Sequence, residues 1–189
     1  MIKQRLSVVQ EILKGSKVDL PFHLKVKMAE LILNLISRRS NFGLFAILGW
    51  RNKWRGFINL PDVSQDIFVR HHINIMNVKP RIRRRYDVSA TAKFDGALLI
   101  DRRGNLVHSG AVIESLRPGI VGQKLNPGDF KDLSEQFGFK QKVHLRHLTA
   151  ITASYTLKDT TVFTVSEETG DFHIFENGRI IYSTVEREI

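Results

Sequence analysis

The sequence predicts an α/β or α+β fold, in which a mixed central β-sheet is flanked by helices and preceded by an N-terminal helical segment. Up to about residue 40, apolar residues recur at helical spacing, whereas short apolar runs bounded by turn residues alternate with helical stretches after it. With 189 residues, 42% of them hydrophobic, the chain can bury one ordinary core. We therefore divide it into a helical segment, residues 1–40, and a larger domain, residues 41–189.

Two helices are expected in the N-terminal segment. The first covers residues 2–14 and stops at Gly15 and Ser16, and the second follows Pro21 and ends near residue 37. Their apolar positions are Ile2, Leu6, Val9 and Leu13, then Leu24, Met28, Leu31, Ile32, Leu35 and Ile36. Because each helix has one apolar face, we expect both helices to pack on the core. The alternative is a docking or regulatory hairpin.

Strands are expected where short apolar runs lie between turn residues. Such runs occupy residues 44–50, 97–100, 106–107, 161–165, 172–175 and 179–182. Asn177-Gly178 is the strongest hairpin signal in the chain, because this pair favours the tight turn that joins two antiparallel strands. Helices are expected between the strands, at residues 127–137 and 146–155.

The composition excludes several chemistries. Without cysteine there can be no disulfide, thiol nucleophile or Cys-ligated zinc. The longest apolar run, Phe42 to Trp50, is too short to span a bilayer, and the N-terminus lacks the apolar core of a secretory signal. We therefore expect a cytoplasmic protein without a membrane span.

Positive charge is concentrated in the first part of the chain. The net charge is +10, and residues 1–110 hold 20 Lys and Arg against 8 Asp and Glu. The densest basic cluster spans residues 79–85 and would attract any polyanion, including nucleic acid or a nucleoside triphosphate. A solvated loop is the simpler interpretation, since no zinc-finger spacing or RNA-recognition signature accompanies it. Nucleic-acid binding stays an alternative.

Three short segments carry side chains suited to a nucleotide and a metal, although no phosphate-loop or GxGxxG motif is present. Asp95 stands just before a strand, and Gly96 allows a ligand to approach the backbone. Arg146 and His147 open a helix, where N–H groups and a guanidinium bind anions. Residues 166–170, Ser-Glu-Glu-Thr-Gly, end a strand with adjacent carboxylates, which suit magnesium. Alone, the Asp-Gly pair and the acidic segment are more typical of solvated turns, and the Arg-His pair could equally be a surface pair.

Together, these segments resemble the diadenylate cyclase family, whose pattern is an Asp-Gly-Ala strand, an Arg-His helix start and a Ser-Glu-Glu or Ser-Glu-Ser strand end. The order matches, as does the gap of roughly 50 residues between the first two segments. The resemblance covers about residues 90–185, is looser over residues 42–90, and is nearest to the family's archaeal-like branch. It implies a nucleotidyltransferase that condenses two ATP molecules into cyclic di-AMP and releases pyrophosphate.

The resemblance also implies a role for each matched residue. Asp95 would orient the ribose 3′-hydroxyl, and Arg146 and His147 would hold the triphosphate. The other matched residues would contact the nucleotide or ligate a magnesium or manganese ion. The implied catalytic residues are Asp95, Arg146 and His147, the nucleotide-binding residues are Gly96, Ala97, Ser166 and Glu167, and the metal ligands are Glu168 and Asp95. Because the hydroxyl of one ATP must meet the α-phosphate of another, a homo-oligomer with face-to-face active sites is implied.

The Arg-His segment departs from the family's frequent Gly-Thr-Arg-His-Arg. Here it reads His144-Leu-Arg-His-Leu148, so the glycine, the hydroxyl and the second arginine are missing. Phe94 also stands where the family often has a histidine. Fewer phosphate contacts favour an alternative, a catalytically degenerate domain that senses a nucleotide or dinucleotide.

Overall fold

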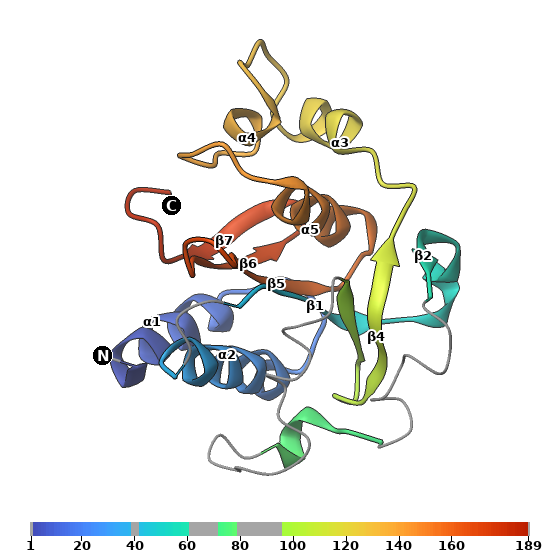
Figure 1. The fold of residues 1–189 in the computed structure, drawn as a ribbon, viewed down its shortest axis with the longest axis vertical. Helices are drawn as coiled ribbons and strands as arrows, with labels where there is room; N and C mark the ends of the chain where they lie inside the picture. The colour runs from blue at the N-terminus through green and yellow to red at the C-terminus, as the bar shows by residue number, and fades with distance from the viewer. Residues whose placement is uncertain (1, 39–41, 61–71, 79–95, 189) are drawn as a thin grey trace.

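The structure is a computed structural model that describes residues 2–38, 42–60, 72–78 and 96–188. Its described strands form one seven-stranded sheet in the order β2-β4-β3-β1-β5-β6-β7 (Figure 1). The strands are β1 (Leu44–Trp50), β2 (Ile58–Asn59), β3 (Ala97–Asp101), β4 (Leu106–Ile113), β5 (Thr161–Val165), β6 (Phe172–Glu176) and β7 (Arg179–Ser183). β1 pairs in parallel with β3 and antiparallel with β5, so the mixed sheet that the sequence predicts is confirmed.

Helices cover both faces of the sheet (Figure 1). The α-helices are α1 (Ile2–Lys14), α2 (Phe22–Ile36), α3 (Pro118–Leu125), α4 (Leu133–Gln136) and α5 (Leu145–Thr156), and short 3-10 helices occupy Asn52–Phe57 and Ile75–Asn77. α1 and α2 lie on one face, and α5 lies on the other with α3 and α4 beyond it. No helix in the described ranges is both long enough and apolar enough to cross a membrane.

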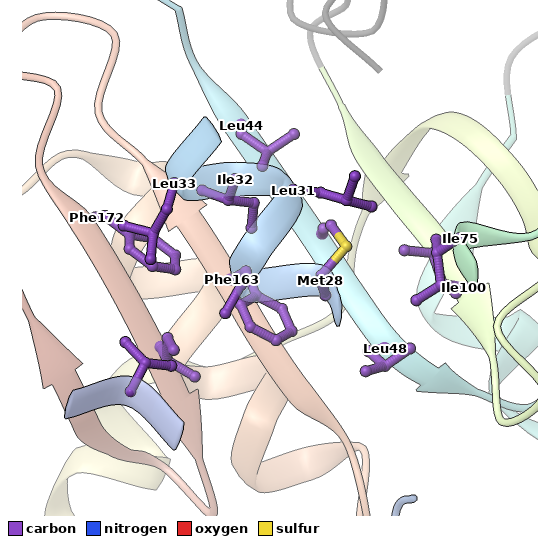
Figure 2. Close-up of a cluster of buried hydrophobic side chains, with 14 of the residues drawn as sticks. Met28, Leu31, Ile32, Leu33, Leu44, Leu48, Ile75, Ile100, Phe163 and Phe172 are labelled. Carbon is purple, nitrogen blue, oxygen red and sulfur yellow. The ribbon is translucent and has the colours of Figure 1, made fainter. Parts of the chain in front are cut away.

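The alternation of side chains along β1 builds two apolar clusters, one on each face. Leu44, Ala46 and Leu48 pack against α1 and α2, whereas Phe45 and Ile47 pack against α5. Figure 2 shows the first cluster, where side chains of α2 meet those of β1, β5 and β6. The two N-terminal helices are therefore core helices, as their apolar faces predict. The domain boundary at residue 40 stays a prediction.

A buried ion pair joins α2 to β6. The ammonium of Lys25 lies 3.5 Å from the carboxylate of Glu176, and their side chains are only 2% and 4% exposed. The Ser16 hydroxyl, in the loop after α1, contacts both partners, and Thr161 of β5 donates a 2.6 Å hydrogen bond to Glu176. Polar contacts, in addition to apolar packing, thus tie the N-terminal helices to the sheet.

The prediction of a helix over residues 127–137 is wrong in its first half. α4 begins only after Asp132, whose side chain accepts hydrogen bonds from the backbone N–H groups of Ser134 and Glu135. Gly128 has φ = 150°, which no helix contains. Instead a helix that the sequence did not predict, α3, precedes it, and Pro118 at its start is the signal that could have revealed it.

Candidate functional site

A pocket of about 780 Å³ opens at one end of the sheet. The strand register puts the starts of β1 and β3 at this end together with the ends of β4 and β5, since Ala97 pairs with Ala111 and Leu44 with Val165. The start of α5 also lines the pocket. Its lining residues are Phe45, Gly96, Ala111, Val112, Ile113, His144, Leu145, Arg146, His147, Thr149, Ser166, Glu167 and Glu168.

The pocket collects residues from all three sequence segments. Of the predicted site residues, it is lined by Gly96, Arg146, His147, Ser166, Glu167 and Glu168. Ala97 does not line it, because it is fully buried in the cluster beneath α5. Asp95 lies outside the described residues, as does the basic cluster at residues 79–85. Strand pairing and the packing of α5 on the sheet therefore bring together segments that are about 50 and 20 positions apart in the sequence.

Gly96 lines the pocket, and the backbone at this position also requires a glycine. Its φ is 143°, and a Cβ atom there would lie 2.5 Å from the carbonyl carbon of Gly110 on β4. Such a contact is far shorter than van der Waals separation, and the neighbouring atoms are backbone. Gly96 thus lets β3 and β4 approach closely at the pocket edge, directly after Asp95.

Arg146 brings a guanidinium to the pocket from the first turn of α5. Its side chain is half-buried and crosses over Gly43, where a Cβ atom would lie only 2.2 Å from Nη1. Gly43 therefore leaves the space that the arginine occupies. Sequence reasoning missed this residue, and its only signal was a glycine immediately before a buried strand.

The turn between β5 and β6 carries the acidic residues. The N–H of Ser166 donates to the carbonyl of Asp171, and the N–H of Gly170 donates to the carbonyl of Ser166, both at 2.9 Å, so the turn is well fixed. Glu167 and Glu168 are exposed on it. The Glu168 carboxylate lies 3.4 Å from Nε2 of His144, which precedes α5. The acidic turn and the helix start thus meet at the pocket mouth.

Carboxylates at this position suit a hard divalent cation, which prefers oxygen ligands. Among the described residues, no three His, Asp or Glu side chains are grouped closely enough to hold a metal by themselves. Asp95, the second predicted ligand, is not among them. Glu168, the predicted metal ligand that the structure describes, lines the pocket with an exposed side chain, and its role as a ligand stays a prediction.

His147 lies in the pocket wall as a neutral side chain. Burial, followed by the nearby His173 and Arg146, lowers its pKa to about 4, and Glu188 opposes this only in part. Its Nε2 atom is buried and has no hydrogen-bond partner among the described residues. At pH 7 His147 can therefore contact a ligand by a hydrogen bond or by packing, but it cannot add positive charge beside Arg146.

The pocket also has an apolar rim that the motifs did not reveal. Leu145 of α5 and Val112 of β4 are 75% and 51% exposed although both are apolar. Leu148 does not line the pocket but packs against the cluster beneath α5. The pocket thus combines one guanidinium, two carboxylates and exposed apolar side chains.

No protein-family model matches the sequence, and a comparison with curated proteins also finds no match. Among solved structures, a hypothetical membrane spanning protein from Bacillus cereus has a similar fold, with a TM-score of 0.50 and 15% identity over 97% of this chain and 79% of that one. DacA from Staphylococcus aureus, solved as a double mutant, has a TM-score of 0.45 and 13% identity over 96% of this chain and 91% of that one. The likeness to the Bacillus cereus protein concerns the fold alone, and its coverage shows that it includes α1 and α2.

Proposed function

We propose that this chain binds ATP in the pocket and, as a diadenylate cyclase, condenses two ATP molecules into cyclic di-AMP. The supporting observation is that Gly96, Arg146 and Glu168, one from each of the three matched segments, line a single pocket. Any of these segments alone would be an ordinary turn or surface pair. Their convergence at one end of the sheet is what a nucleotide site requires.

In the proposed function, different residues of the pocket bind the phosphates, the base and the metal. Arg146 and the N–H groups at the start of α5 bind the phosphates, because a guanidinium and a helix N-terminus both favour negative charge. The apolar side chains of Leu145 and Val112 contact the base. Glu168 and Asp95 would hold magnesium or manganese, which when bound would neutralise charge on the leaving pyrophosphate.

Two copies of the chain are needed for the reaction. The pocket holds a single set of the matched residues, whereas the 3′-hydroxyl of one ATP must attack the α-phosphate of the other. Holding both nucleotides in line is the main catalytic device, because positioning can lower such a barrier by about 7–11 kcal/mol. We therefore propose a homo-oligomer in which two pockets face each other.

Incubation of the protein with ATP and manganese, followed by mass analysis, tests this function. We expect cyclic di-AMP and pyrophosphate, with a specific activity that rises with protein concentration because two chains must meet. A strictly monomeric protein that makes the product would contradict the face-to-face arrangement. Absence of ATP binding in calorimetry, with either metal present, would contradict the nucleotide site itself.

Arg146→Ala should weaken ATP binding by about 10- to 100-fold, because a charge-assisted hydrogen bond to phosphate is worth about 1.5–3 kcal/mol. The matched control is Arg103→Ala, which removes an exposed arginine from the β3–β4 turn at the opposite end of that hairpin. Calorimetry should show little change for the control, since exposed charges are screened. Equal losses in the two variants would indicate general attraction of polyanions instead.

A nucleotide sensor is the second candidate. It is supported by the neutral state of His147 and by Leu148, which leave Arg146 as the cationic side chain from the first turn of α5. A protein that binds ATP or a cyclic dinucleotide but forms no product with either metal would support this candidate over the enzyme.

A further inference from the structure

Three buried side chains, those of His147, His173 and Glu188, lie in a row from the pocket to the C-terminal segment. His147, in the pocket wall, packs edge-to-face against His173 of β6, with ring centroids 5.0 Å apart and an angle of 84° between the rings. Phe139 contacts both rings, at 6.1 Å and 5.7 Å. His147 is only 7% exposed and His173 only 2%. Neither ring can therefore turn without displacing the other or Phe139.

Glu188 is the member of this row that lies farthest from the pocket. Its Oε2 lies 2.6 Å from Nε2 of His173, and the two side chains are 2% and 3% exposed. The same carboxylate accepts hydrogen bonds from the hydroxyl of Ser183 and the backbone N–H of Lys140. Figure 1 shows the C-terminal segment turning back toward the loop that leads into α5, where Lys140 lies.

These contacts select one form of the His173 ring. A carboxylate only accepts hydrogen bonds, so Nε2 of His173 must carry the proton that it shares with Glu188. Nδ1 of His173 is buried and has no hydrogen-bond partner among the described residues, so the hydrogen bond that orients the ring is the one from Nε2. Glu188 therefore holds a proton on Nε2 of His173 and fixes the orientation of the ring that supports His147.

We propose that Glu188 is a positioning residue of the nucleotide pocket, acting through His173 on the ring of His147. In this arrangement the C-terminal segment, residues 183–188, shapes the pocket wall next to Arg146 without touching the ligand. The effect on nucleotide affinity rests on the proposed function, whereas the state of the two rings does not. The competing interpretation is that Glu188 only holds the segment in place.

Imidazole NMR of the nitrogen-15-labelled protein without nucleotide provides the first test. We expect His173 of the wild-type protein to be protonated on Nε2, and His147 to be neutral at pH 7. Glu188→Ala should change the tautomer of His173 and shift the ring signals of His147. Glu188→Gln should preserve the tautomer, since its amide oxygen still accepts from Nε2. The matched control is Glu186→Ala, because Glu186 is exposed two positions earlier.

ATP calorimetry on the same variants provides the second test. We expect Glu188→Ala to weaken binding by about three- to thirtyfold, the range for residues that act through a neighbour. Glu188→Gln should restore most of the affinity, and the Glu186→Ala control should match the wild type. The proposal is overturned if wild-type His173 carries its proton on Nδ1, or if Glu188→Ala leaves ATP affinity unchanged. A wild-type protein that binds no ATP contradicts the proposed function, and the ring spectra still decide whether Glu188 positions His147.

Discussion

Glu176→Ala is expected to lower the free energy of unfolding by about 3–5 kcal/mol, the cost of leaving a buried charge unpaired. Glu176 is the ion-pair partner of Lys25, whose side chain is 2% exposed. The contacts that would remain for the ammonium are with the Ser16 hydroxyl at 2.7 Å and the Val18 carbonyl at 3.4 Å. Neither of these carries a charge that compensates for the lost carboxylate.

Urea unfolding of the variant and the wild type measures this effect. The double variant Lys25→Met with Glu176→Leu should recover most of the loss, because apolar residues of similar size can replace a buried ion pair. Asp19→Ala serves as the control, since it breaks the Asp19–Arg102 pair, in which Asp19 is 80% exposed, and should cost at most about 1 kcal/mol. A loss below about 1 kcal/mol for Glu176→Ala would contradict the role assigned to this pair.

Gly96→Ala is the second substitution that we expect to lower the free energy of unfolding substantially. The added Cβ would meet backbone atoms of Gly110 at 2.5–2.7 Å, and φ = 143° is a conformation that side chains rarely adopt. Strain of this kind costs about 1–3 kcal/mol by itself, and the separation of β3 from β4 adds to it. ATP affinity should fall as well, because the strand edge beside Asp95 moves.

Urea unfolding and ATP calorimetry together check this prediction. Gly119→Ala is the matched control, because Gly119 lies in α3 with no atom within 4 Å of its Cβ position. There alanine should raise stability by about 0.4–1 kcal/mol, since it restricts the unfolded chain at a site where helix is already formed. If Gly96→Ala were as stable as the wild type, β3 and β4 could not approach as closely as described.

The elements that the sequence predicts correctly are those whose signals are local. The apolar periodicity of α1 and α2 and the short runs of β1, β5, β6 and β7 mark each element within its own residues. The turn at Asn177-Gly178 is equally local, since both residues adopt positive φ between β6 and β7. α3 was missed, because Gly119 and Gly122 obscure its helical pattern. The first half of the helix expected at residues 127–137 was predicted where the structure has no helix, although Gly128 disfavours a helix there.

In the candidate site, too, some features have local signals in the sequence and others do not. Its motif residues are visible in the sequence because each motif spans only a few positions. Other features depend on residues far apart in the chain, namely the space that Gly43 leaves for Arg146, the apolar rim of Val112 and Leu145, and the contact from Glu188 to His173. Only strand register and helix packing place such residues side by side, so only the tertiary structure decided them. It also decided that His147 is neutral, because burial sets its pKa and no local pattern records burial.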